Sequence, residues 1–90
     1  MISYTPEIRP SCKKDMQKTG KKNPVLQKVL EAKMQEVLQQ PHHYKPLQHD
    51  LAGIRRVHIL KSFVLTYAIH EEKKTVEFIA FSHHDDAYKR

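Results

Sequence analysis

Arginine, histidine and aliphatic side chains alternate over residues 54–60, which read Ile-Arg-Arg-Val-His-Ile-Leu. If this segment is a strand, Arg56 and His58 lie on one face of it, and Val57 and Ile59 lie on the other. A guanidinium group can hold a phosphate by two hydrogen bonds and can stabilise the negative charge that develops on it during a reaction. An imidazole can donate or accept a proton near neutral pH. The segment therefore favours chemistry on a phosphate ester, and ordinary charge on an exposed strand is the alternative.

Seven histidines occur in 90 residues, and the adjacent pairs His42–His43 and His83–His84 raise the question of a metal site. Neighbouring side chains on a strand point in opposite directions, and no two histidines have the i, i+4 spacing that puts ligands on one side of a helix. Cys12 is the only cysteine, so the chain has neither a Cys-based zinc site nor an internal disulfide. We expect no metal and no other cofactor.

Positive charge is concentrated near the N-terminus, where eight Lys or Arg residues from Arg9 to Lys33 are accompanied only by Asp15 and Glu31. The formal net charge of the whole chain is +6. Such charge raises the local concentration of RNA, DNA or an acidic protein segment. The cluster is typical of lysines that hold phosphate groups and position RNA without reading its sequence. A solvated helical surface is the alternative interpretation.

The N-terminal segment predicts a short strand followed by a helix. Residues 1–4 alternate between apolar and polar side chains, as a strand does. The helix begins either at Pro6, with Thr5 as its N-cap, or at Pro10, because a proline inside a helix forfeits a backbone hydrogen bond. Gly20 is expected to end the helix in a left-handed turn. The predicted apolar side of this helix consists of Ile8, Cys12 and Met16.

A second helix is predicted between Asn23 and Pro41. Asn23 is a favourable N-cap, Pro24 suits the first helical position, and Pro41 stops the helix. Apolar residues recur at steps of three and four, so they form one stripe along the helix. The stripe consists of Leu26, Val29, Leu30, Met34, Val37 and Leu38.

The period of the apolar residues changes to two after the second helix. Three segments rich in β-branched and aromatic side chains are residues 54–60, 63–70 and 75–83. They predict an antiparallel meander, and residues 71–74 form its clearest turn. One domain over residues 1–90 is then expected, with an α+β fold in which two N-terminal helices pack on one face of a small, mainly antiparallel sheet. The opposite face stays partly open, and the chemistry would take place there.

Several short motifs resemble the RelE/YoeB family of toxins from bacterial and archaeal toxin-antitoxin pairs. A Pro-Leu-x-x-x-Leu-x-Gly turn at residues 46–53 precedes the basic strand, and a His-x-x-x-x-Tyr tail spans residues 83–88. The segments Tyr4-Thr5-Pro6 and Lys13-Lys14-Asp15 are also similar to family members. The resemblance implies a RelE-like toxin that cleaves messenger RNA in the ribosomal decoding site without a metal, the ribose 2′-hydroxyl attacking the adjacent phosphate. Its implied partners are the ribosome, messenger RNA and a small acidic antitoxin.

The resemblance also implies site residues. The catalytic positions that it assigns are Arg56, Lys61, His84 and Tyr88. The positions assigned to RNA binding, from the resemblance together with the basic cluster, are Lys13, Lys14, Lys21, Lys22, Lys45, His49, Arg55, His58 and His83. The chain departs from the family pattern at Val64, where relatives have an arginine that acts on the scissile phosphate. The phosphate clamp would then come from Arg56 or Lys61, or be absent.

Two other functions stay open for the same scaffold. A ParE-like protein inhibits DNA gyrase by protein contact, and the Tyr88 tail argues against that alternative. A purely RNA-binding or ribosome-binding protein, or a toxin that has lost its activity, would keep the positive patch and cleave nothing, and Val64 favours that alternative. No apolar run approaches the roughly 20 residues of a membrane span, and the N-terminus lacks the apolar core of a signal peptide. We therefore expect no membrane association and a cytoplasmic protein.

Overall fold

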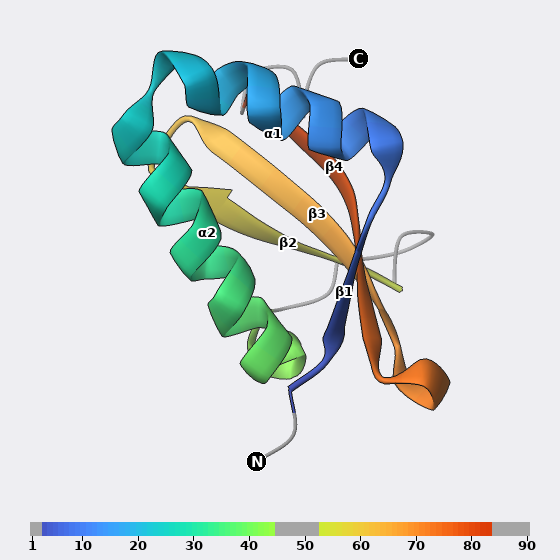
Figure 1. Ribbon diagram of the computed structural model, residues 1–90. Coiled ribbons are helices and arrows are strands. Elements are labelled where there is room, and N and C mark those ends of the chain that lie inside the picture. The colour runs from blue at the N-terminus through green and yellow to red at the C-terminus, as the bar shows by residue number, and fades with distance from the viewer. Residues whose placement is uncertain (1–2, 45–52, 84–90) are drawn as a thin grey trace.

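The computed structural model describes residues 3–44 and 53–83. Two helices pack on one side of a four-stranded sheet (Figure 1). The strands are β1 (Thr5–Ile8), β2 (Ile54–Ile59), β3 (Phe63–His70) and β4 (Thr75–His83), and the helices are α1 (Pro10–Lys22) and α2 (Pro24–Gln39). Short 3₁₀ turns, η1 (Pro41–His43) and η3 (Glu71–Lys73), follow α2 and β3. This arrangement confirms the predicted α+β fold.

The sheet has the strand order β1-β4-β3-β2. The last three strands form the predicted antiparallel meander, whereas β1 joins β4 in parallel, with Thr5 opposite Thr75 and Ile8 opposite Phe78. The chain thus leaves the sheet after β1, forms both helices, and returns to build the other three strands. The parallel pair is the reason that the sheet is mainly, and not entirely, antiparallel.

The N-terminal strand lies further along the chain than predicted. It spans Thr5–Ile8 and α1 begins at Pro10, so the second of the two predicted helix starts is correct and Pro6 is a strand residue. The backbone N–H of Thr5 donates to the carbonyl of Lys74 at 2.9 Å. Because strand N–H groups alternate in direction, the nitrogen of Pro6 faces away from β4, where a missing donor breaks no ladder hydrogen bond.

The corner between the two helices is made by Asn23 and Pro24. The side-chain oxygen of Asn23 accepts a hydrogen bond from the N–H of Leu26 at 3.1 Å, which confirms the predicted N-cap. The prediction that Gly20 ends α1 is wrong, because the helix continues beyond it. A Cβ atom at Gly20 would lie 2.0 Å from the side-chain oxygen of Gln27 in α2. The glycine therefore serves the close approach of the two helices and makes no left-handed turn.

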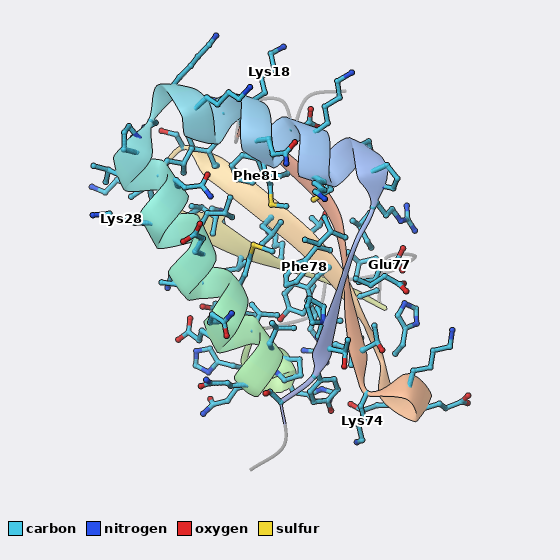
Figure 2. The ribbon with its side chains drawn as sticks, viewed as in Figure 1. Lys18, Lys28, Lys74, Glu77, Phe78 and Phe81 are labelled. Atoms are coloured by element: carbon cyan, nitrogen blue, oxygen red, sulfur yellow. The ribbon has the colours of Figure 1, made fainter. Side chains whose placement is uncertain are left out.

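Each helix buries one side against the sheet. The buried residues are Cys12 and Met16 of α1, and Leu26, Leu30, Val37 and Leu38 of α2, all of which belong to the predicted apolar stripes. Val29 and Met34 are half-buried against the core, and Ile8 lies in β1 and not in α1 as predicted. Figure 2 shows Phe78 and Phe81 between the sheet and these helices. Within the part of the chain that the structure describes, no helix is both long and apolar enough to cross a membrane.

The buried Tyr67 links the core to the turn after α2. Its hydroxyl donates a hydrogen bond to the carbonyl of Pro41 at 2.7 Å. Burial raises the pKa of Tyr67 to about 12, so the phenol keeps its proton as a donor. The one polar atom of this large core side chain is thereby satisfied, as a buried hydroxyl requires.

Candidate functional site

The face of the sheet turned away from the helices carries two rows of paired residues. One row is Arg56, Thr66 and Ala80, and the next is His58, Val64 and Ser82. We call these two rows the outer face. Neither α1 nor α2 covers it (Figure 1).

Arg56 and His58 lie on the outer face, as predicted, because Val57 and Ile59 are buried on the opposite side of β2. Arg56 is half-buried and His58 is exposed. The other residues of the two rows have short side chains. The outer face therefore has a guanidinium and an imidazole along one border, next to rows of short side chains.

Val64 occupies the centre of its row, between His58 on β2 and Ser82 on β4. It keeps only 2% of its surface exposed, although it does not belong to the hydrophobic cluster that packs under the helices. A valine cannot supply positive charge to the middle of this surface. A phosphate at this position would have to be bound by a residue at the border of the outer face, and Arg56 is the one arginine in the two rows.

Arg55 points the opposite way, toward the helices. Its guanidinium donates to the backbone carbonyl of Tyr44 at 2.5 Å and approaches Nδ1 of His42 at 3.4 Å. Both acceptors lie in or beside η1, so Arg55 joins β2 to the turn after α2. An RNA contact by Arg55 stays a prediction.

Lys61 and His83 lie at one end of the sheet. Lys61 is exposed in the turn between β2 and β3, next to Leu60, which has a left-handed φ of 56°. His83 pairs with Phe63, and the two rings meet edge to face with centroids 5.3 Å apart. Because Phe81, two residues earlier, is buried, His83 lies on the helix-covered side. The structure places neither Lys61 nor His83 in the two rows of the outer face.

An acid–base cluster that sequence reasoning missed lies beyond the other end of these rows. Glu77 on β4 accepts a hydrogen bond from Nε of Arg9 at 2.6 Å and lies 2.9 Å from Nε2 of His70. The hydrogen bonds from Arg9 and then from His70 lower the pKa of Glu77 below its ordinary value. The cluster joins Arg9, the residue between β1 and α1, to β4 and β3. Arg9 and Glu77 are 68 residues apart, so no local spacing signals the pair.

Glu71 makes a second such junction at the turn between β3 and β4. It accepts hydrogen bonds from Lys74 at 2.8 Å and from the hydroxyl of Tyr4 at 2.7 Å, and it lies 2.5 Å from Nε2 of His42. These three contacts, the one from Lys74 first, lower the pKa of Glu71 to about 2. The residue before β1, the turn after α2 and the β3–β4 turn thus meet at one carboxylate.

The basic cluster covers the solvent side of α1. Its predicted RNA-binding members Lys13, Lys14, Lys21 and Lys22 are all exposed. Figure 2 shows Lys18 and Lys28 extending away from the body of the protein as well. Exposed ammonium groups along one helix can contact successive phosphates of a polyanion. The remaining predicted site residues, which are Lys45, His49, His84 and Tyr88, lie outside the described residues.

Metal-ligand side chains are scattered over the structure. Among residues 3–44 and 53–83, no three His, Cys, Asp or Glu side chains gather where they could hold an ion. Cys12 is fully buried, and burial raises the pKa of its thiol to about 11. It is therefore a neutral core residue at physiological pH and not a nucleophile.

The sequence matches the family model of the ParE toxin of type II toxin-antitoxin systems over residues 7–88. This chain belongs to that toxin family. The toxin is 48% identical over 87 residues to a candidate toxin, RelE4, of Methanocaldococcus jannaschii, with 97% of this chain and 93% of the relative covered. It is 38% identical over 85 residues to a protein of Methanosarcina mazei, with 94% of this chain and 99% of the relative covered.

Solved toxin structures share the fold. The RelBE2 toxin-antitoxin complex of Mycobacterium tuberculosis matches with a TM-score of 0.74 and 26% identity, over 92% of this toxin and 93% of that chain. The intact RelBE complex of E. coli matches with a TM-score of 0.75 and 22% identity, over 89% and 95%. The YoeB/ParE toxin of Agrobacterium tumefaciens matches with a TM-score of 0.79 and 15% identity, over 89% and 98%. The family model and the relative of Methanocaldococcus jannaschii, together with the shared fold, place the toxin in the RelE/ParE superfamily.

Proposed function

We propose that this toxin inhibits translation as a metal-independent endoribonuclease that cuts messenger RNA on the ribosome. The observation that carries the proposal is the outer face, on which Arg56 and His58 stand together beside residues with short side chains. A guanidinium next to an imidazole suits a phosphate ester, because the first stabilises charge and the second binds or exchanges a proton. The resemblance to RelE/YoeB toxins supports RNA as the polyanion.

The proposed reaction begins when a ribose 2′-hydroxyl attacks the adjacent phosphorus. A bond forms between the 2′-oxygen and phosphorus, and the bond from phosphorus to the 5′-oxygen of the next nucleotide breaks. The products carry a 2′,3′-cyclic phosphate and a 5′-hydroxyl. One group must accept the proton of the 2′-hydroxyl, and another must give a proton to the leaving oxygen.

The candidate residues divide into those that bind the RNA or stabilise its charge and those that transfer protons. Arg56 would stabilise the negative charge on the phosphate, and the exposed His58 would hold the RNA next to it. Proton transfer is assigned to His84 and Tyr88, which lie outside the described residues. Lys61, in the turn after β2, would add positive charge at the end of the sheet. The lysines of α1 would position the RNA and the ribosome through phosphate contacts.

We further propose that a small acidic antitoxin covers the basic surface when the toxin is held inactive. The net charge of +6 favours an acidic segment, and the outer face, which neither α1 nor α2 covers, offers a place for it. The RelBE2 and RelBE neighbours were solved as toxin-antitoxin complexes, which supports a partner of this kind. A segment that folds on binding would bury on the order of 1,000–3,000 Å².

Two alternatives have an observation in their favour. The family model that matches is that of the ParE toxin, which favours protein-mediated inhibition of DNA gyrase. Val64, in the middle of the outer face, favours a protein that binds RNA or the ribosome without cutting. In both alternatives the messenger RNA stays intact, whereas the nuclease cuts it.

One experiment separates the three functions. The purified toxin is added to a translation reaction with purified ribosomes, the 5′ ends of the messenger are mapped, and gyrase supercoiling is measured in parallel. The nuclease predicts new 5′ ends that are weakened in Arg56→Ala and unchanged in Lys73→Ala, which removes an exposed lysine of η3 outside the basic cluster. Translation that stops without new ends indicates binding alone, and lost supercoiling with an intact messenger indicates gyrase inhibition.

A further inference from the structure

A cavity of about 520 Å³ opens between the second half of α1 and the end of the sheet where β3 begins and β4 ends. This volume lies in the range of roughly 300–1,000 Å³ that is usual for small-molecule sites. The lining includes Lys18 and Lys22 of α1 and Phe63 and His83 of the sheet. The cavity lies mainly on the helix-covered side of the sheet, where Phe81 and His83 are, and Ser82 is the one residue of the outer face among its described lining residues.

The sheet side of the cavity is aromatic. The rings of Phe63 and Phe81 stack with centroids 5.3 Å apart and an interplanar angle of 9°. Phe81 is buried beneath α1, whereas Phe63 is half-buried, so Phe63 presents accessible ring surface to the cavity. His83 stands edge-on to Phe63 and borders the same space. A surface of this kind stacks with a flat ring, and it accepts any nucleobase because every base has a π-face.

The helix side of the cavity is charged. Lys18 and Lys22 are four residues apart, so they lie one above the other on α1. Both lysines line the cavity, and the side chain of Lys18 extends outward from the helix (Figure 2). Asp15, one turn before Lys18, is the one carboxylate among the described lining residues. Two cations that border the cavity attract a phosphate, and the carboxylate can accept hydrogen bonds from N–H donors.

We propose that this cavity binds one unpaired nucleotide of single-stranded RNA, with its base against Phe63 and its phosphate between Lys18 and Lys22. Asp15 then meets the edge of the base. Guanine presents two adjacent N–H donors, at N1 and N2, to such an acceptor, so it is the preferred base. The choice of RNA as ligand rests on the proposed function, but binding at this site requires neither the ribosome nor cleavage. The site would hold a nucleotide at a distance from the cleaved bond.

The test is a nuclear magnetic resonance titration of the ¹⁵N-labelled toxin with 5′-GMP and with 5′-AMP. Saturable shifts are expected at Thr19, Phe63 and His83, and not at His58 on the outer face. GMP should bind several-fold more tightly than AMP. Phe63→Leu, which keeps an apolar side chain and removes the ring, should weaken binding by about fivefold or more.

Charge variants on the surface of α1 provide the matched control. Lys18→Ala and Lys22→Ala should each weaken GMP binding several-fold, whereas Lys13→Ala and Lys14→Ala, which remove the same charge outside the lining, should not. These surface variants keep the test valid if Phe63→Leu unfolds the toxin. Equal weakening by all four, or shifts that never saturate, would overturn the proposal. Equal affinities for GMP and AMP would overturn the role of Asp15.

The outcome is independent of the nuclease assay. If GMP saturates the cavity while ribosomes and messenger stay intact, the proposed function fails and the nucleotide site stands. If the messenger is cut while GMP produces no localised shifts, the nucleotide site fails and the proposed function stands. Arg56→Ala gives an internal reference, since it should lower cleavage without changing GMP binding.

Discussion

Two adjacent arginines on β2 test whether the two faces of the sheet have different roles. Arg55 points toward the helices and holds η1, whereas Arg56 lies on the outer face. Arg55→Ala should therefore reduce stability and leave the reacting groups in place. Arg56→Ala should reduce cleavage and leave the fold largely intact. The two variants remove the same side chain from neighbouring positions, so each is the control for the other.

The expected magnitudes come from the contacts of each residue. Arg55 donates a charged hydrogen bond to the carbonyl of Tyr44, and loss of such a bond costs about 1.5–3 kcal/mol of unfolding free energy. For a domain of this size, each kcal/mol corresponds to about 4–8 °C in Tm. Arg56 is half-buried at the border of the outer face, and a charged interaction near a protein surface contributes about 1 kcal/mol or less. Removal of a group that stabilises transition-state charge lowers the rate by about 10²-fold or more.

Both quantities are measured on the same preparations. Thermal and urea unfolding give the stability of wild type, Arg55→Ala and Arg56→Ala, and single-turnover cleavage of ribosome-bound messenger is then measured well below the lowest Tm. The reasoning is refuted if Arg56→Ala cleaves at the wild-type rate. It is also refuted if Arg55→Ala, fully folded at the assay temperature, loses as much activity as Arg56→Ala.

Three further perturbations address charge, pH and the centre of the outer face. The logarithm of the affinity for single-stranded RNA should fall linearly with the logarithm of the salt concentration. The slope should shrink by about 0.7 for each phosphate-binding lysine that is replaced, and an affinity that does not change with salt would contradict the polyanion interpretation. Because folding lowers the pKa of Glu71 from 4.5 to about 2, its stabilising effect is complete above pH 4.5 and is lost as the pH falls toward 2. Glu71→Gln should therefore flatten the Tm profile in that window, and a profile parallel to that of wild type would contradict this role. Val64→Arg should destabilise the toxin by about 1–3 kcal/mol, because the valine is only 2% exposed. If the missing guanidinium limits the rate of cleavage, the molecules of this variant that remain folded should cleave faster than wild type. Urea unfolding and single-turnover cleavage of this variant decide both points, and unchanged stability would mean that the site has space for the longer side chain.

Signals that act over a few residues predicted most of the fold. The cap at Asn23 and the proline after it define the corner between the helices, and the spacing of apolar residues gives the buried side of α2. The alternation of Val57 and Ile59 with Arg56 and His58 gives the correct faces of β2. In each case the residues that cause the feature lie within one turn of helix or within one strand, so the feature can be predicted from the local sequence.

Pairing between distant segments could not be predicted in this way. The strand β1 has only four residues, none of them fully buried, and its partner β4 begins about 70 residues later. Arg9 and Glu77 are brought together by that same pairing. Lys61 was assigned from resemblance, and its place in a turn depends on where β2 ends. These features follow from the register of the sheet and not from any local pattern.

A β-bulge on β4 decides which side chains reach the outer face. Tyr67 pairs with Phe78 and Thr66 pairs with Ala80, so Ile79 is one residue more than the pairing requires. From this point the alternation along β4 is shifted by one position. The sequence of β4 contains no glycine or proline that would have marked the shift.

Without the bulge, the alternation that begins with the buried Val76 would turn Phe81 and His83 toward the outer face. With it, Phe81 is 3% exposed and lies beneath the helices, and the short side chain of Ser82 takes the place in the row of His58. A phenyl ring in that row would cover the surface on which the RNA is proposed to lie. A one-residue slip exchanges the two sets of side chains on a strand. The accessible basic face of this toxin therefore depends on the extra residue in β4 as much as on the arginine and histidine of β2.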